Sequence, residues 1–321
     1  MRPSFFTALL LGLITTQFSF GQANFESRDK EVSSKNKVKR QIQWSYDFAN
    51  GKPSLKGYKS ASNTYDNKGN VIEELNYKAD GSIASVVDYT YDSNGNKTSF
   101  TRYKGNKEKK TYEQKTTYDA KGNKLVESGF DGVSTFSNTF SYDANVKLIE
   151  IKYTTDKVLS EKRSIQYEGN TTVMLINNAF NSTLSRELTT FDNKKNIIEE
   201  VKYIQDNVTQ KSNYSYDKNG NKIEEAKQNF GNFAYKRKYI YDDKGNTIKI
   251  TEEKPAGHIY IAYEYKYDVK SNVTEEKWAK DNASEYSMKS HKYDAKNLLI
   301  ESNCYFASYK FAVLYKYTYE F

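Results

Sequence analysis

The stretch Asn213-Tyr214-Ser215-Tyr216-Asp217-Lys218-Asn219-Gly220-Asn221-Lys222-Ile223 decides the fold, because its centre, Tyr-Asp-x-x-Gly-Asn, recurs along the chain. Four more intact copies begin at Tyr65, Tyr91, Tyr118 and Tyr241. Degenerate copies begin at Tyr142, Tyr167, Phe191, Tyr267, Tyr293 and Tyr319, so that successive copies lie 24 to 27 residues apart. A fixed period of this length predicts a repeat architecture, here of about eleven units.

Each part of the motif has a physical role in a β-hairpin. The aspartate side chain can bond the backbone two residues on, and the glycine supplies the left-handed conformation that closes a bulged turn. The predicted turn residues are Asp66, Gly69, Asp92, Gly95, Asp119, Gly122, Asp217, Gly220, Asp242 and Gly245. Asn297 replaces the glycine in one copy and is expected to tolerate the conformation, whereas Lys195 and Ser271 predict strained or altered turns.

The residues around each turn predict two strands per repeat. A large or β-branched residue precedes the motif tyrosine by two positions, as at Tyr214, Tyr239 and Tyr265, so both side chains share one face. Stacked repeats then form a ladder of tyrosines across the strands. In the second strand, the apolar position two places past the Asn is out of phase with the next aromatic residue, which predicts a β-bulge there.

The composition indicates an all-β protein whose sheet has one buried aromatic face and one solvent-exposed face. Mean hydropathy is −0.88 and only 37% of residues are apolar, although the chain has 29 tyrosines. About twenty antiparallel strands follow from two strands per repeat, and an open sheet of more than roughly ten strands coils. We therefore predict an antiparallel β-hairpin repeat array that forms a coiled, solenoid-like sheet, with tyrosines inward and lysines and glutamates outward.

The chain divides into three parts. Residues 1–23 are typical of a signal peptide, with Arg2 before an apolar run that is too short to span a membrane. Residues 24–40 are predicted to be a flexible lead-in, and residues 41–321 the repeat sheet, with 41–64 as an atypical capping repeat. Cys304 is the only cysteine, so no intrachain disulfide can form. The predicted location is secreted or cell envelope, in the periplasm or at the outer surface, after signal cleavage.

The five intact motifs at this period resemble the RHS/YD-repeat family, from about residue 40 to the end. The resemblance implies an extracellular bacterial repeat protein, often associated with carbohydrate binding or with polymorphic toxins. Large members wind their repeats into a shell around a C-terminal toxin. Here the sequence ends in the strand Tyr315 to Phe321, without a self-cleaving core or a toxin domain, so toxin delivery is not expected. The short form is similar to exported proteins of Bacteroidetes.

Catalytic and metal-binding patterns are weak. The only histidines are His258 and His291, and His291 occupies a ladder position two before Tyr293. Paired glutamates recur at one repeat position, at 73–74, 199–200, 224–225 and 275–276, and indicate either a solvated face offset by lysines or a calcium-binding column. The Asp-x-Asn-x-Asn runs lack the spacing of a calcium loop, and no zinc spacing exists. We predict no catalytic residue, no metal and no cofactor.

Two further patterns bear on the membrane and on nucleic acid. The alternation from Val313 to Phe321 resembles the last strand of an outer-membrane barrel. However, Lys222, Glu224 and Glu225 place charge on both faces of one strand, which a lipid-facing band does not bear. Neither a transmembrane span nor a nucleic-acid partner is predicted, because lysines alternate with glutamates and form no basic block.

The binding hypothesis rests on aromatic side chains at a concave face. Aromatic rings can act as stacking platforms, and the predicted binding residues are Trp44, Trp278, Tyr214, Tyr239 and Tyr265. The first hypothesis is an exported, non-enzymatic scaffold that binds a glycan or a partner such as another envelope protein. The second is a purely structural or adhesive envelope component. The third is a glycan-active enzyme with a carboxylate pair.

Overall fold

The computed structural model describes residues 20–279 and 285–321. The predicted signal peptide, 1–23, therefore lies mostly outside the described residues. Helix α1 spans Phe20–Lys35, so it begins within the predicted signal peptide and continues through most of the predicted lead-in, residues 24–40. Among the described residues, no helix is both long and apolar enough to cross a membrane.

Almost all of the remaining described chain is β-structure. The first half contains β1 (Arg40–Ala49), β2 (Lys52–Pro53), β3 (Tyr58–Tyr65), β4 (Val71–Tyr77), β5 (Ile83–Tyr91), β6 (Lys97–Lys104), β7 (Lys109–Tyr118), β8 (Lys124–Phe130), β9 (Thr135–Tyr142), β10 (Leu148–Thr155), β11 (Val158–Glu168) and β12 (Thr171–Asn178). The second half contains β13 (Thr183–Phe191), β14 (Ile197–Ile204), β15 (Asn207–Tyr216), β16 (Lys222–Asn229), β17 (Asn232–Tyr241), β18 (Thr247–Glu253), β19 (Ile259–Tyr267), β20 (Val273–Trp278), β21 (Ser287–Tyr293), β22 (Leu299–Phe306) and β23 (Phe311–Glu320). The described chain also contains two 3₁₀ turns, η1 (Pro255–Gly257) and η2 (Ala307–Tyr309).

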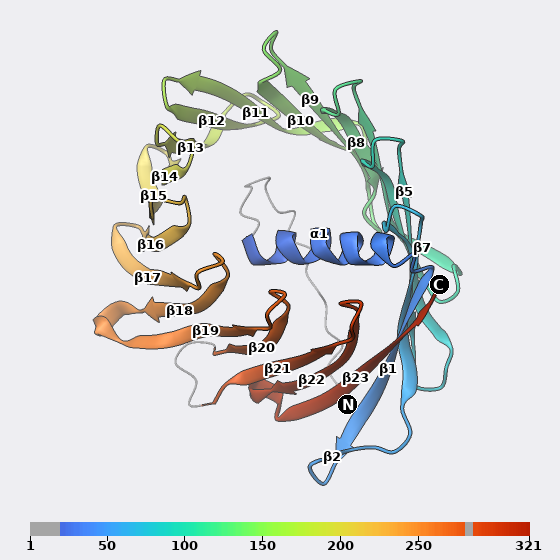
Figure 1. Ribbon diagram of the computed structural model, residues 1–321. Helices are drawn as coiled ribbons and strands as arrows, with labels where there is room; N and C mark the ends of the chain where they lie inside the picture. The colour runs from blue at the N-terminus through green and yellow to red at the C-terminus, as the bar shows by residue number, and fades with distance from the viewer. Residues whose placement is uncertain (1–19, 280–284) are drawn as a thin grey trace.

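The sheet closes on itself. From β3 onward each strand pairs antiparallel with the next, and β1 pairs with β3 on one side and with β23 on the other. In the described part of the chain, 22 of the 23 strands thus form a closed barrel, and β2 pairs only with the end of β1 (Figure 1). The all-β class is confirmed, but the predicted open, solenoid-like sheet is wrong.

Closure has a simple physical cause. An open array would leave β1 and β23 with unpaired backbone N–H and C=O groups along one edge each, and pairing these edges satisfies both. The register runs without interruption from Arg40 opposite Glu320 to Asp47 opposite Val313. At a strand spacing of about 4.8 Å and a usual tilt, 22 strands give a barrel of about 40 Å diameter.

The Tyr-Asp turns form one end of this barrel. Asp66 Oδ1 accepts hydrogen bonds from the backbone N–H groups of Lys68 (2.8 Å) and Asn70 (2.9 Å), and Oδ2 accepts one from the Asn70 side chain (2.7 Å). The same three bonds occur at Asp92, Asp119, Asp192, Asp217, Asp242 and Asp268. The motif glycines adopt the left-handed conformation, with φ between 77° and 87° at Gly69, Gly95, Gly122, Gly220 and Gly245.

Copies without glycine keep the same turn. Lys195, Ser271 and Asn297 all have φ between 61° and 69°, and each donates its N–H to the motif aspartate carbonyl at 3.0 Å. Val146, with φ of 64°, does the same at Asp143. The turns at Lys195 and Ser271 are therefore strained in backbone conformation but not altered in hydrogen bonding.

A β-bulge follows each of these turns. Tyr241 pairs with Thr247, whereas Ile240 pairs with Lys249, so Ile248 is the extra residue in the second strand. The same skip is found at Ile72, Thr98, Leu125, Ile149, Ile198, Ile223, Thr274 and Ile300. The out-of-phase aliphatic position in the sequence is thus the bulge itself.

The tyrosine ladder faces the inside of the barrel. Helix α1 lies within the ring of strands (Figure 1), and its Asp29 carboxylate is near the motif tyrosines Tyr65, Tyr293 and Tyr319. Burial raises the pKa of Tyr65, with the nearby Asp29 carboxylate of α1 adding to it and a hydrogen bond to Ser33 of α1 opposing it. Since side chains alternate along a strand, the residues in phase with Tyr65 point inward and their neighbours point outward.

Candidate functional site

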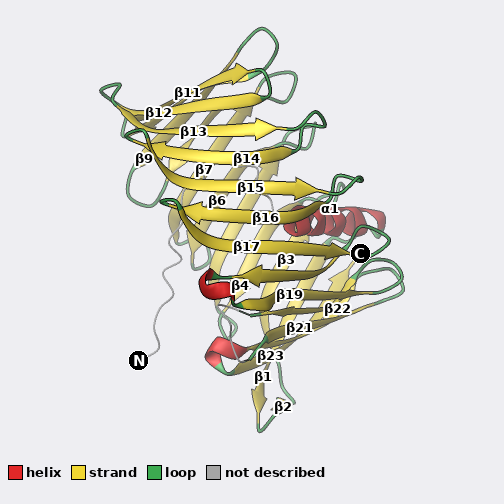
Figure 2. Cartoon of the chain, turned by 90° about the vertical axis from the view of Figure 1, so that its left-hand side faces the viewer, coloured by secondary structure: helices red, strands yellow, loops and turns green. Residues whose placement is uncertain are grey.

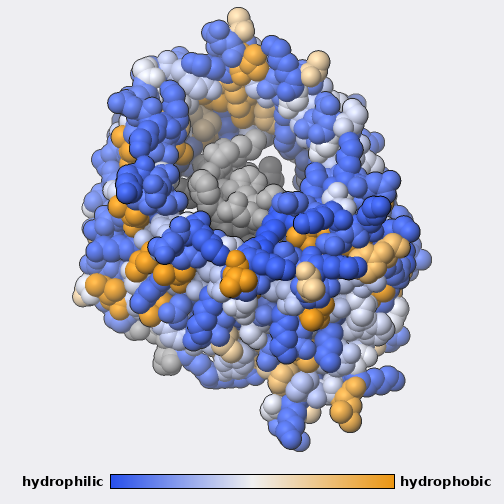
Figure 3. Space-filling view, viewed as in Figure 1, coloured by the Kyte–Doolittle hydropathy of each residue, from blue (hydrophilic) through white to orange (hydrophobic). Residues whose placement is uncertain are grey.

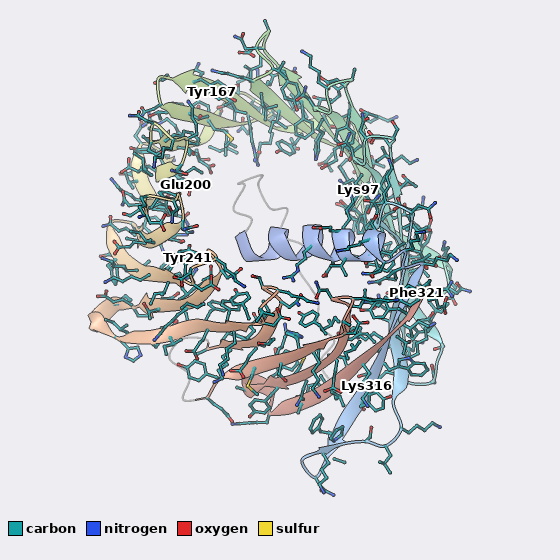
Figure 4. All side chains as sticks on the ribbon, in the orientation of Figure 1. Lys97, Tyr167, Glu200, Tyr241, Lys316 and Phe321 are labelled. Carbon is teal, nitrogen blue, oxygen red and sulfur yellow. The ribbon has the colours of Figure 1, made fainter. Side chains whose placement is uncertain are left out.

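The inner wall of the lumen is the surface on which aromatic and charged side chains meet. Here, "inner wall" denotes the inward-facing side chains of β14 to β19. They include Glu200, Tyr214, Lys222, Glu225, Tyr235, Arg237, Tyr239, Glu252, Tyr260 and Tyr265. Figure 4 labels Glu200 and Tyr241 on this side of the barrel and Lys97 on the opposite side.

Glu225 is the centre of one network on the inner wall. Its side chain is almost completely buried and accepts hydrogen bonds from the hydroxyls of Tyr235 (2.6 Å) and Tyr239 (2.9 Å). Lys222 donates a third at 2.9 Å and also lies over the rings of Tyr214 and Tyr239. Burial acts to raise the pKa of Glu225, but these donors and the Lys222 charge outweigh burial and lower it.

Glu252 is the centre of a second network, one hairpin further on. It is 2% exposed and contacts Arg237 Nε at 2.6 Å, the Tyr260 hydroxyl at 2.7 Å and Lys254 Nζ at 2.9 Å. Burial opposes ionisation of Glu252 as well, yet its pKa is lowered by the hydrogen bonds from Lys254, Tyr260 and Arg237. Both carboxylates are therefore held ionised inside the barrel by neighbouring donors.

These carboxylates explain the paired glutamates of the sequence. Consecutive strand residues point to opposite faces, so each pair is divided by the sheet. The first member points outward to a lysine, as in Glu199 with Lys211 (2.5 Å) and Glu224 with Lys236 (2.9 Å). The second points inward to a tyrosine, as in Glu200 with Tyr214 (2.5 Å). The glutamate pairs predicted either a solvated face offset by lysines or a calcium-binding column. The two-residue period of a strand was the signal that could have assigned the two members of each pair to opposite faces.

Aromatic rings continue around the lumen on the opposite side. Tyr89, Phe100, Tyr112 and Phe136 form a chain across β5 to β9, with ring centroids 5.3 to 6.1 Å apart. Near β19, Tyr263 and Tyr265 stack with centroids 6.3 Å apart and nearly parallel planes. The inward face thus carries aromatic rings on both sides of the lumen, with charged side chains beside them.

The five predicted binding residues do not all share one surface. Tyr214, Tyr239 and Tyr265 lie on the inner wall, and Trp278 is also inward, opposite Tyr263, with its ring edge on Phe306 at 6.1 Å. Trp44 is on the outer face, because it pairs with Lys316 between two inward tyrosines of β23. The structure therefore brings four of the five to the lumen and separates Trp44 from them.

Most motif tyrosines have a structural hydrogen bond. Tyr241 donates its hydroxyl to the Lys222 carbonyl at 2.7 Å, at the start of the second strand of the preceding repeat. Within the described residues the same bond is made by Tyr91, Tyr118, Tyr142, Tyr167, Tyr216, Tyr267, Tyr293 and Tyr319. This bond ties each hairpin to the previous one at the turn end, next to the bulge.

Helix α1 lies across the turn end of the lumen. Arg28 donates to the carbonyls of Lys270 (3.0 Å) and Ser271 and to the Asn272 side chain. Asn36 donates to the Lys296 carbonyl at 3.2 Å, next to a pocket of about 340 Å³ between α1 and these turns. Figure 3 shows mainly hydrophilic residues around the turn end of the lumen, where α1 lies. The helix is thus held by polar contacts to the turns.

The remaining candidate residues have structural surroundings. His291 lies on the lumen side, with Nδ1 at 2.8 Å from Ser302 Oγ, and burial lowers its pKa to about 4. Cys304 is buried, and burial raises the pKa of its thiol. In residues 20–279 and 285–321, no three His, Cys, Asp or Glu side chains are grouped so that they could hold a metal ion.

Comparison with known proteins gives distant likenesses only. No protein-family model and no curated protein matches the chain. Among solved structures, TcdB2-TccC3-Cdc42 is 11% identical over 82% of this chain, with a TM-score of 0.30. A porin-like protein from Bacteroides uniformis is 9% identical over 88% of this chain and 96% of its own, with a TM-score of 0.32.

A porin-like protein from Bacteroides vulgatus gives similar values, with 11% identity, a TM-score of 0.24, and coverage of 88% of this chain and 98% of its own. The chain spans less than a quarter of the TcdB2-TccC3 chains that it matches. Because these TM-scores are low, the function proposed below rests on the chain's own residues.

Proposed function

We propose that this chain is an exported, non-catalytic barrel of the bacterial cell envelope that binds a glycan inside its tyrosine-lined lumen. The observation that carries the proposal is the inner wall, where aromatic rings alternate with ionised carboxylates and lysines. Such a surface suits a sugar ring, because its C–H face packs on an aromatic ring while its hydroxyls bond the polar groups beside it.

Two stacked tyrosines and a tryptophan on β19 and β20 are more specific candidates than the motif tyrosines. Tyr263 and Tyr265 stack beside Trp278, and within residues 20–279 and 285–321 neither makes the hydroxyl-to-carbonyl bond that ties the hairpins together. Glu276 pairs with Tyr265 and adds a carboxylate at the same level. We propose this group, Tyr263, Tyr265, Glu276 and Trp278, as the main glycan-contacting surface.

A structural role is the second candidate, and one observation favours it. The repeated bond from a motif tyrosine to the preceding repeat shows that many of the tyrosines stabilise the barrel. A barrel that serves only as an envelope scaffold would need these tyrosines and no ligand.

A glycan array followed by calorimetric titration separates the two candidates. For a glycan that binds the purified chain, Tyr265→Ala and Trp278→Ala are each expected to weaken binding by about tenfold, the effect of losing one stacked ring. Trp44→Ala is the matched control, because it removes an aromatic ring from the outer face of β1. An equal loss with Trp44→Ala, or no glycan bound at all, contradicts lumen binding. Release of reducing sugar from a bound glycan contradicts a non-catalytic role.

A further inference from the structure

The two ends of the barrel differ in chemistry. The Tyr-Asp turns and α1 lie at one end, and the connections between repeats, including η1 and η2, lie at the other (Figure 2). Of the described residues, seven aliphatic or phenylalanine side chains are more than three-fifths exposed, and six of these lie at the connection end. These six, named the apolar rim, are Leu55, Val133, Val158, Phe180, Phe230 and Ile259.

The members of the apolar rim come from six different connections. Phe180 lies between β12 and β13 and is 88% exposed, and Phe230 lies between β16 and β17 and is 73% exposed. Neighbouring connections at one end are separated by two strands, or about 10 Å. The rim is therefore a ring of separate apolar tips and not a continuous groove.

The charged side chains at the connection end differ in how far they extend into solvent. Lys52, Lys56 and Lys157 are exposed in connections that carry the rim, and Lys104 and Lys109 are exposed beside the β6–β7 connection at the same end. Asp131 and Asp156 fold back on the backbone, whereas Asp47, Glu108 and Asp206 are exposed at the same end. Asp131 accepts from the N–H groups of Val133 and Ser134, and Asp156 accepts from that of Thr135. Asp131 and Asp156 thus shape their turns, while the five lysines extend into solvent.

We propose that the apolar rim docks the barrel end-on to an anionic lipid bilayer. Separate apolar tips fit a lipid surface, because lipids rearrange around each inserted side chain, whereas a folded protein partner needs a continuous complementary patch. The exposed lysines lie where anionic headgroups would be. The outer walls carry ion pairs such as Glu224 with Lys236, and these stay in water in an end-on orientation.

End-on docking determines which end of the lumen faces away from the membrane. With the connection end on the bilayer, the end that carries α1 faces away from the membrane. The inference does not depend on which ligand the lumen binds, since it uses only residues at the connection end.

Vesicle co-flotation of the full chain tests the proposal. The chain is expected to bind vesicles that contain phosphatidylglycerol, to bind pure phosphatidylcholine more weakly, and to lose binding as salt screens the lysines. Phe180→Asn and Phe230→Asn should each lower the partition coefficient by about tenfold or more. Both side chains are exposed, and Phe230 has a φ of 48° that asparagine tolerates, so the variants are expected to fold.

The matched control is Val269→Asn. Val269 is 86% exposed but lies in a Tyr-Asp turn at the opposite end, so this change should leave vesicle binding unaltered. Leu55→Gln, in the β2–β3 connection, gives a second rim variant should either phenylalanine variant misfold. Equal losses with Val269→Asn overturn the proposal, as does a wild-type chain that binds neither vesicle. A dimer that the rim variants abolish, without vesicle binding, assigns the rim to a second copy of the chain instead.

Discussion

Two adjacent glutamates offer a direct test of which face of β16 points inward. We expect Glu225→Gln to lower the free energy of unfolding by about 3 kcal/mol. Three donors lose an ionised acceptor, and a hydrogen bond to a charged group exceeds a neutral one by roughly 1 kcal/mol. Glu224→Gln is the matched control. Glu224 is about one-third exposed and pairs with Lys236 at 2.9 Å on the outer face, a kind of pair that contributes about 0 to 1 kcal/mol.

The assay is urea unfolding at neutral pH, followed by tyrosine fluorescence and far-ultraviolet circular dichroism. A double-mutant cycle with Tyr239→Phe isolates the contact, and we expect a coupling energy of about 1 kcal/mol or more with Glu225 and almost none with Glu224. If the two glutamine variants differed by less than about 0.5 kcal/mol, the assignment of Glu225 to a buried network would be refuted.

Further predictions concern the turns and one histidine. Gly220→Val should cost more than about 1 kcal/mol, because φ is 87° there, whereas Gly220→Asn should cost less; equal thermal unfolding of both variants would contradict the role of the left-handed turn. Val146→Gly should stabilise the barrel by about 1 kcal/mol, since valine at φ 64° is strained; an unchanged or lower melting temperature would contradict this. The pKa of His291 is about 4 in the folded protein and 6.5 when unfolded, so stability is complete above pH 6.5 and falls as the pH drops towards 4, by up to about 3 kcal/mol. His291→Gln should flatten that dependence between pH 6.5 and 5, and an unaltered slope would show that other groups cause it.

The local structure could be predicted from the sequence because it is determined by short-range chemistry. The aspartate and glycine of each motif act within five residues, as in Asp217, which accepts from the N–H groups of Asn219 and Asn221. The bulge after the turn was also visible as a break in alternation, and it lies at Ile223 in this repeat. Neither feature depends on how the repeats are arranged in space.

The division of the candidate site between two faces was harder to predict. Trp44 and Trp278 are both strand residues in tyrosine-rich surroundings, and composition alone does not assign them to a face. Their faces follow from register: Trp44 is out of phase with the inward residues Gln41 and Gln43, whereas Trp278 is opposite the inward Tyr263. The same reasoning separates Glu224 from Glu225, and it needs the pairing partner as well as the sequence.

Closure of the barrel depends on two segments that are far apart in the chain. The sequence of a repeat indicates how each hairpin contacts the next one. It does not indicate whether the last strand pairs with the first. The decisive contact is between β1, which lies outside the regular motif, and β23, whose inward residues Tyr315, Tyr317 and Tyr319 pair with Ser45, Gln43 and Gln41. Polar residues without rings at those β1 positions accommodate three large rings, and Gln41 donates to the Tyr319 hydroxyl at 2.9 Å. The atypical first strand is therefore the complement of the last one, and this complementarity converts an open repeat array into a closed wall around a lumen.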